Sequence, residues 1–460
     1  MAVVPALRAS TSNSGISLEE AFNAKDITTA EMNTAIQSWF EWFYERQKTD
    51  EQDPSQRIPY IVVTKLTRTV FSEFEASSQN AFAQTILDAF VKVRKKGMQR
   101  VLIGGEALLK PLFFGGEWRF SVIDRQNYLV FGRNEEGELT DIGTSEETTT
   151  GSHRYTLLER RHVDEKGYLT IENRLYRSKD SLGLGSAVPL SSLPKYADLE
   201  ATMTFQQPIG SIGLIPIRTP MENCVDGSDD SISVYEPAMG LIELIAINEA
   251  QLSGEFDRGE SRVIASGDMM MAGDDGKPRF DDHIFTGLPG GPDEIGITIF
   301  SPAFREQSFL ARKAEYLRNV ESLIGFKRGI LSEVEAAERT ATEITSSAGD
   351  YSLTIKDFQN AFEGAIREAV RLCGILGKIY SVPGAADVKD DDVIISFGNG
   401  ILYDEDKVWE QYRDMAARGL IKPEIAVAWY FNISWETEAD LAEIREKYMP
   451  MIEDLENADA

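Results

Sequence analysis

Cysteine and histidine are scarce in this chain of 460 residues, and their scarcity excludes several kinds of site. The two cysteines, Cys224 and Cys373, are too few for a disulfide framework and favour two thiols in a reducing compartment. The three histidines, His153, His162 and His283, occur in no H-E-x-x-H motif and in no zinc-like Cys/His spacing. We therefore expect surface or strand histidines and no metal site.

The motifs of several enzyme classes are missing as well. The sequence G-L-P-G-G at residues 287–291 lacks the Lys and Ser/Thr of a phosphate-binding loop. The acidic sequence D-G-S-D-D at residues 226–230 lacks the ligand spacing and the final Glu of a calcium loop. No G-x-S-x-G elbow occurs, and carboxylate pairs are too frequent in so acidic a chain to indicate acid–base chemistry. We expect no catalytic residue, no cofactor and no enzyme.

Long apolar runs are also absent. The longest candidate, at about residues 241–247, is far shorter than the ~18 residues that span a bilayer. The first 15 residues contain no apolar core of signal-peptide length, so we expect synthesis in the cytosol and no membrane partner. The net charge of −28 argues against a protein that grips nucleic acid by neutralising phosphates, although DNA as a sliding cargo remains compatible.

The first half of the chain predicts helices followed by an antiparallel sheet. Amphipathic stretches predict helices at about residues 28–47, 61–75 and 80–96, the last ended by Gly97 with basic residues in its final turn. From residue 100 the apolar period becomes two. Strands are predicted at residues 101–103, 107–113, 118–123, 128–132, 155–163 and 168–176. Two loops are expected, a Glu/Thr-rich one at residues 144–150 and a proline-containing one at residues 181–223.

The second half predicts two helices that bracket a small insert. The first helix runs from Pro237 to about residue 256 and is apolar almost all round at residues 238–247, so it needs cover on several sides. The insert, residues 259–301, contains a predicted strand at residues 262–265. Ser301 and Pro302 then start a helix that runs to about residue 324.

A linker and a very long helix follow. Gly325 and Gly329 give the linker, residues 325–339, backbone freedom. Thr340 and Glu343 form a T-x-x-E capping box, after which apolar residues recur at helical spacing to about residue 380. Such a helix would be about 60 Å long at ~1.5 Å per residue. A strand at residues 393–397 and helices from about residues 404, 423 and 436 complete the chain.

This order of helix, small insert, helix, linker and long helix resembles the portal proteins of tailed bacteriophages, of the type found in long-tailed phages of Gram-positive bacteria. Four stretches carry the resemblance. They are TLLERRHVDEKGYLTIENRLYRS at residues 156–178, SVYEPAMGLIELIAINEAQLSGEFDRGESRVIA at 233–265, IFSPAFREQSFLARKAEYLRNVESLIGFKRGILS at 299–332 and ERTATEITS at 338–346.

The resemblance implies an α+β fold with a wing of helices and antiparallel sheet, a helical stem, a small α/β clip and a helical crown. Transferred to this sequence, the parts fall in chain order. They are the wing at residues 1–235, stem helices at 236–258 and 302–324 around a clip at 259–301, a tunnel loop at 325–339, a long wing helix at 340–390, and a C-terminal strand with crown helices at 391–460.

The resemblance also implies a function. Twelve copies would form a ring at one capsid vertex, through which double-stranded DNA enters, is retained and leaves as non-specific cargo. Partners would be the terminase motor, a head–tail connector protein, and the major capsid and scaffolding proteins, with assembly in the host cytoplasm and a final place in the virion. The alternative is another phage head structural or connector protein that has no axial channel.

Three sets of site residues follow from this transfer. The channel or tunnel-loop candidates are Lys327, Arg328, Glu333, Glu335 and Glu338, and the stem candidates are Glu243, Glu249, Glu255, Arg312 and Lys313. The cations among them could touch DNA weakly or, equally, form salt bridges between subunits. Ile242 and Ile245 are the subunit-contact candidates, because a closed ring buries an apolar helix face in every copy. The alternative for this helix is burial in the core of its own chain.

Overall fold

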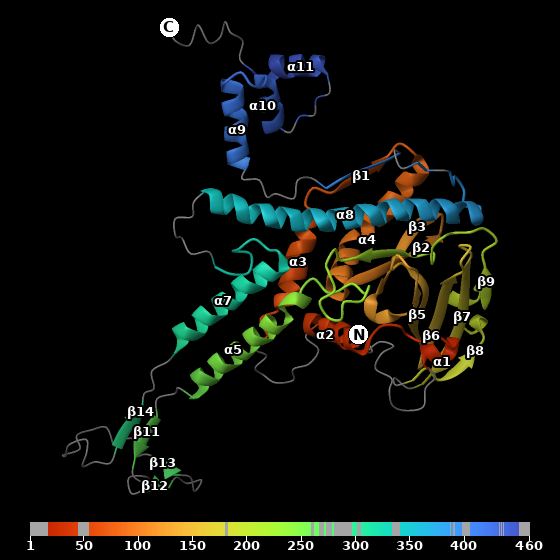
Figure 1. The fold of residues 1–460 in the computed structure, drawn as a ribbon, viewed down its shortest axis with the longest axis horizontal. Helices are drawn as coiled ribbons and strands as arrows, with labels where there is room; N and C mark the ends of the chain where they lie inside the picture. Colours follow the sequence, from red (N-terminus) through yellow and green to blue (C-terminus); the bar gives the residue numbers. More distant parts are fainter. Residues whose placement is uncertain are drawn as a thin grey trace. The chain divides into compact units, whose positions relative to one another are not determined.

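The chain separates into two units, Met1–Gly400 and Ile401–Ala460, which are described separately. The computed structural model describes residues 17–44, 55–179, 183–258, 262–265, 271–272, 278–279, 297–300, 305–333, 341–386, 388–389, 392–397, 405–431, 433, 435 and 437–449. The described residues form helices and antiparallel sheets joined by loops, consistent with the predicted α+β class (Figure 1). No helix among them is apolar over a length that would cross a membrane.

Four helices open the first unit. They are α1 (Leu18–Phe22), α2 (Ala30–Tyr44), α3 (Ile58–Val70) and α4 (Ala81–Gly104). The predicted end of α4 at Gly97 is wrong, because Gly97 is buried inside the helix and the chain turns only at Gly105, with φ +79°. The strand predicted at residues 101–103 is therefore wrong too, since these apolar residues are buried on the last turn of α4.

Two antiparallel sheets follow. The first has the order β10-β2-β3, with β2 (Glu106–Phe114) and β3 (Glu117–Asp124) joined by Gly115 and Gly116. Both glycines have positive φ, 64° and 84°, as the tight hairpin turn requires. The second sheet has six strands: β4 (Tyr128–Arg133), β5 (Leu139–Thr150), β6 (His153–Val163), β7 (Leu169–Ser178), β8 (Ser186–Val188) and β9 (Thr202–Thr204).

One sequence prediction in this region was wrong. Residues 144–150, expected to form a loop, are a regular part of β5, paired with β6 from Thr144–Glu159 to Thr150–His153. Composition was misleading here because an exposed strand end needs few apolar residues. The stretch at residues 181–223 is loop-rich, as predicted, and also contributes the short strands β8, β9 and β10 (Ile215–Arg218).

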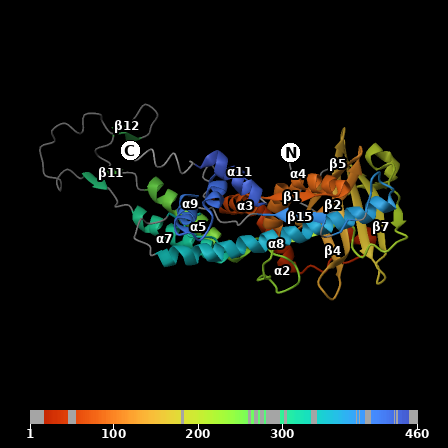
Figure 2. The same ribbon diagram turned by 90° about the horizontal axis from the view of Figure 1, so that it is seen from above.

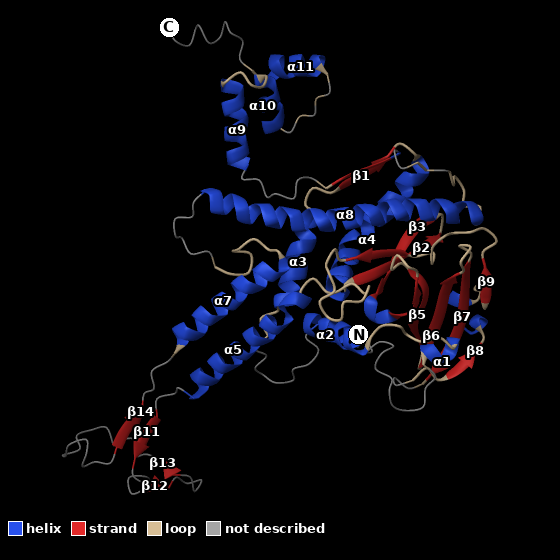
Figure 3. Cartoon of the chain, in the orientation of Figure 1, coloured by secondary structure: helices blue, strands red, loops and turns tan. Residues whose placement is uncertain are grey.

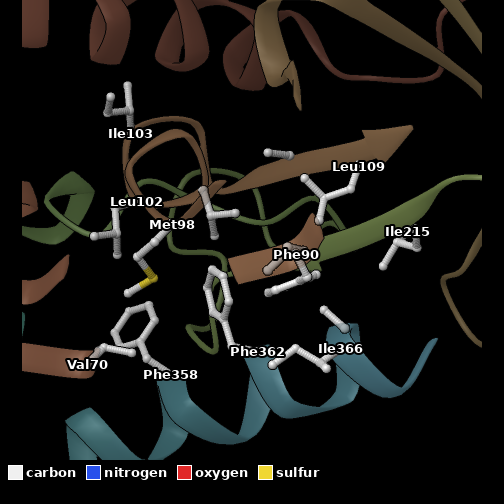
Figure 4. Packing of buried hydrophobic residues seen from close by; sticks show 14 of the residues in the cluster. Val70, Phe90, Met98, Leu102, Ile103, Leu109, Ile215, Phe358, Phe362 and Ile366 are labelled. Atoms are coloured by element: carbon white, nitrogen blue, oxygen red, sulfur yellow. The ribbon is translucent and has the colours of Figure 1, made fainter. Parts of the chain in front are cut away.

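The long helix is confirmed as α8 (Ala341–Ile379), with 39 residues. Thr340 of the proposed capping box lies outside the described residues. The apolar face of α8 packs on α4 and β10, and Figure 4 shows Phe358, Phe362 and Ile366 pointing at side chains of those elements. Figure 2 shows α8 extending past the helices and both sheets of the first unit. The helix therefore lies along one core shared by most elements of that unit.

The remaining elements also match their predictions in kind. The strand β15 (Val393–Ser396) pairs antiparallel with β1 (Glu75–Ser78), a short strand that the sequence did not indicate between the second and third predicted helices. In the second unit, α9 (Glu405–Ala417), α10 (Pro423–Tyr430) and α11 (Glu438–Tyr448) are the three helices predicted from the sequence. A small cluster of Ala428, Leu441 and Ile444 forms the buried part of this unit.

A buried carboxylate links the two sheets. Glu159 of β6 lies 2.7 Å from Lys110 Nζ of β2 and 2.7 Å from Arg161 Nε. Burial alone raises the pKa of Glu159, but the charges of Arg161 and Lys110 and their hydrogen bonds outweigh it and lower the pKa to about 2. The ionised form is thus the one that the folded state prefers.

We predict that Glu159→Gln lowers the free energy of unfolding by about 3 kcal/mol at pH 7, because folding lowers the pKa of Glu159 to about 2. Because the folded-state pKa is depressed, this stabilisation is present above the unfolded pKa and is lost as the pH falls towards about 2. Denaturant unfolding from pH 7 to pH 2 measures it, with the exposed Glu165→Gln as the control. A difference between parent and variant that does not shrink in acid would contradict the prediction.

Candidate functional site

The candidate site is built on a pair of helices, α5 (Met239–Arg258) and α7 (Glu306–Ile324). Pro237 stands in a short 3-10 turn, η4 (Glu236–Ala238), which leads into α5 as the sequence predicted for a helix start. The two helices run in opposite directions side by side (Figure 3). Ser301 and Pro302, the predicted start of the second helix, lie outside the described residues.

The described residues between the two helices in the sequence form four short strands. The strands β11 (Arg262–Ala265) and β14 (Ile297–Phe300) pair with each other, and β12 (Met271–Ala272) pairs with β13 (Pro278–Arg279). The predicted strand at residues 262–265 is confirmed. The other predictions for this insert lie outside the described residues.

Polar contacts within the chain join α5 to α7. Lys313 Nζ lies 2.7 Å from Glu249 Oε1, so two of the predicted stem residues pair with each other. Glu255 accepts hydrogen bonds from Arg305 Nη2 at 2.7 Å and Nε at 3.1 Å, a partner that the sequence did not indicate. The buried Asn248 donates to the Phe309 carbonyl at 3.2 Å. These charges therefore hold the two helices together within one chain, and the assignment of Lys313 and Glu249 to a stem remains a prediction.

The other two stem candidates lie at the surface. Glu243 is exposed on α5, and Arg312 is exposed on α7, where its Nε donates to Tyr316 Oη at 2.8 Å. The guanidinium of Arg312 also lies over the Tyr316 ring, 5.4 Å from its centroid. Among the predicted stem residues, Glu243 and Arg312 are thus the two whose side chains reach the exposed surface.

The assignment of Ile242 and Ile245 to subunit contacts is corrected. Ile242 is 2% exposed and Ile245 0% exposed, and both belong to the main core of their own chain. Val320 and Ile324 of α7 are members of the same core cluster. The alternative, burial within the chain, therefore holds for these two side chains, because the base of the helix pair is packed into the core.

The opposite face of α5 carries apolar side chains that the chain leaves uncovered. Leu244 is 38% exposed and Ile247 is 52% exposed. Gly240 and Gln251 are exposed as well, which places the four residues at alternating four- and three-residue steps along one face. The sequence signal was the apolar run itself, but periodicity alone did not separate its inner face from its outer face. Leu244 and Ile247 replace Ile242 and Ile245 as candidates for a contact with another chain.

The described part of the loop after α7, residues 325–333, folds back onto α7 and α8. Gly325 has φ +78° and caps α7, and a Cβ at this position would meet Thr354 Oγ1 at 2.5 Å. Lys327 is half-buried, whereas Arg328 and Glu333 are exposed. The glycine is therefore needed for geometry and close packing, and the expectation that it provides freedom is corrected. Glu335 and Glu338 lie outside the described residues.

A buried acid at the end of α7 was missed from the sequence. Glu321 is fully buried, and its carboxylate accepts hydrogen bonds from the backbone N–H groups of Gly329 at 3.1 Å and Ser332 at 2.9 Å. The signal was available, because Glu321 occupies the helix face of Val320 and Ile324 and precedes a glycine-containing segment.

Metal and thiol chemistry find no assembled site in the described part of the chain. No group of three or more His, Cys, Asp or Glu side chains there is arranged to hold a metal ion. In the acidic turn at residues 226–230, Asp230 accepts hydrogen bonds from Arg125 Nη2 at 3.1 Å and Arg133 Nη2 at 2.7 Å. Cys224 is exposed and Cys373 is buried, and both are free thiols.

Comparison with known proteins assigns no family. No family model matches the chain, and no curated protein matches it significantly.

Proposed function

We propose that this chain is the subunit of a portal-like ring, a structural channel at one capsid vertex for entry, retention and exit of double-stranded DNA. The observation that carries the proposal is the uncovered apolar face of α5, at Leu244 and Ile247, on a helix whose other face is rooted in the core. The resemblance in element order supports it: α5, a small stranded insert, α7, a loop and the long α8.

The physical argument for a ring concerns what covers that face. Apolar side chains in a row on an exposed helix favour burial against another chain. A heterologous contact, in which α5 of one copy meets a different surface of the next, closes into a ring when the rotation divides the circle. Every copy then buries Leu244 and Ile247 once. In such a ring the helix pairs would form the stem, the strands β11–β14 the clip, and α9–α11 the crown.

Charge supports DNA as a cargo that slides. Twelve copies at −28 each carry −336. Lys313 and Arg305, the cations of the helix pair that face carboxylates, are neutralised by Glu249 and Glu255 of the same chain. They add little attraction for phosphate, so a bore lined by such helices would repel DNA and hold it weakly.

In this role the ring would dock the terminase motor and, at the insert, a head–tail connector. The second candidate is a head structural or connector protein without a channel, which the same uncovered helix face would also suit. An enzymatic role is tested by assaying the purified chain for ATPase and nuclease activity, neither of which the proposal expects.

We predict that Ile247→Asp abolishes ring formation and leaves the fold intact. Ile247 is 52% exposed in the single chain, so the carboxylate is solvated there and becomes buried without a partner only at the contact. Native mass spectrometry should show an assembly near twelve copies for the parent, thirteen being equally acceptable, and smaller species for the variant.

Two matched variants separate assembly from folding. Ile245→Asp places a carboxylate in the core, where it should lower the free energy of unfolding by several kcal/mol, roughly 3–5. Ile27→Asp changes a residue that is also 52% exposed but lies outside the helix pair, and it should leave the rings intact. Normal rings from Ile247→Asp, or a monomeric parent at every salt and protein concentration, would contradict the proposed contact.

We also predict that deleting Glu333–Glu338 leaves ring formation intact and lowers the yield of DNA-filled heads several-fold. The deletion begins after residues 325–332, the part of the loop that contacts α7 and α8, so these contacts are retained. A variant with six Gly/Ser residues in place of residues 333–338 separates loop length from side-chain identity. An unchanged yield of filled heads for the deletion would identify an ordinary surface loop.

A further inference from the structure

The carboxylate of Glu321 has all its described partners in the loop that follows its own helix. Oε1 accepts hydrogen bonds from the backbone N–H groups of Gly329 at 3.1 Å, Leu331 at 2.5 Å and Ser332 at 2.9 Å. Oε2 accepts one from the Ser332 hydroxyl at 2.7 Å. The residue is 0% exposed. Four donors from three residues of the loop, two of them from Ser332, therefore converge on one buried acid.

These donors hold the carboxylate without help from a cation in the described segments, where no lysine or arginine forms an ion pair with Glu321. A buried carboxylate is costly unless its oxygens are satisfied, and hydrogen bonds to a charged acceptor are the stronger kind. The loop must therefore stay folded on Glu321 for the acid to remain buried. The acid and the loop conformation depend on each other.

The same loop is attached to two further helices. Phe326 is buried with its ring edge-on to Tyr351 of α8, at 5.9 Å between centroids and 86° between planes. Tyr351 Oη in turn donates to Thr69 Oγ1 of α3 at 3.1 Å. Gly325 packs closely on Thr354. Residues 325–332 thus form a fixed segment that joins α7, α8 and α3.

Two cations project from this fixed segment. Lys327 is half-buried and Arg328 is exposed, and neither forms a hydrogen bond or ion pair within the described residues. Their backbone lies between the buried Phe326 and Gly329, which donates to Glu321, so a phosphate that meets them incurs little cost of ordering the loop. A chain of net charge −28 presents these cations at the one described segment that leads from the helix pair to α8.

We propose that Glu321 is a positioning residue that fixes the first half of the loop as a rigid base, which presents Lys327 and Arg328 to the phosphate backbone of passing DNA. This inference rests on the proposed channel function. It replaces a loop that is free along its whole length with one whose first half is fixed.

The test is hydrogen–deuterium exchange of the full assembled chain, read at the amides of Gly329, Leu331 and Ser332. Glu321→Gln replaces one acceptor oxygen by an NH₂ group that faces donors, and exchange at these amides should rise about tenfold or more. Ser332→Ala keeps the carboxylate and removes a single donor, so it should raise exchange less. It also keeps the test valid if Glu321→Gln fails to fold. Glu315→Gln, an exposed position on the same helix, should leave exchange at the parental value.

Packaging provides the second readout. Among variants that form rings, Glu321→Gln should lower the yield of DNA-filled heads, and Lys327→Ala with Arg328→Ala should do so without raising amide exchange. If amide exchange stays at the parental value in both Glu321→Gln and Ser332→Ala, Glu321 does not hold the loop. If exchange rises while the yield of DNA-filled heads is unchanged, Glu321 does not position the two cations for DNA. A parent that forms no ring contradicts the proposed function instead, and amide exchange alone then decides whether Glu321 holds the loop.

Discussion

The first unit depends on burial of the apolar face of α8. Ile355, Phe358, Phe362 and Ile366 are buried along this helix, and they share one core with α3, α4 and β10. An isolated helix gains little stability from its own hydrogen bonds, so most of the stability of so long a helix comes from this packing. The base of α5 and α7 enters the same core through Ile245 and Val320.

Packing the base of the helix pair into the core determines which of its side chains are buried and which are exposed. Ile242 and Ile245 are buried in the core of the chain, and the ion pair between Glu249 and Lys313 joins the two helices. On the outer face, Leu244 and Ile247 remain exposed among the described residues. Since one core holds α5, α7, α8 and Phe326 of the loop, a load on the helix pair would reach the loop through packed side chains.

Periodicity was sufficient to predict the helix pair, the long helix and most strands, because their apolar spacing agrees with their burial. It was insufficient where tertiary contacts decide. Gly97 reads as a helix end but lies inside α4, and the polar residues 144–150 form a strand because β6 supplies a partner. Because residues 238–247 are apolar on almost every side of the helix, the sequence did not indicate that Ile245 is buried and Ile247 exposed. The burial of Glu321 could have been inferred from its place near Val320 and Ile324, but its hydrogen-bond partners could not, since they depend on a loop conformation that no local pattern encodes.

The central claim is that copies of this chain surround an axial bore. The most direct measurement is electron microscopy of the purified full chain, with particles classified by view. The account predicts end-on views with rotational symmetry near twelvefold and a central hole, which Ile247→Asp abolishes. Particles of defined mass whose end-on views are solid, or a chain that stays monomeric, would contradict it.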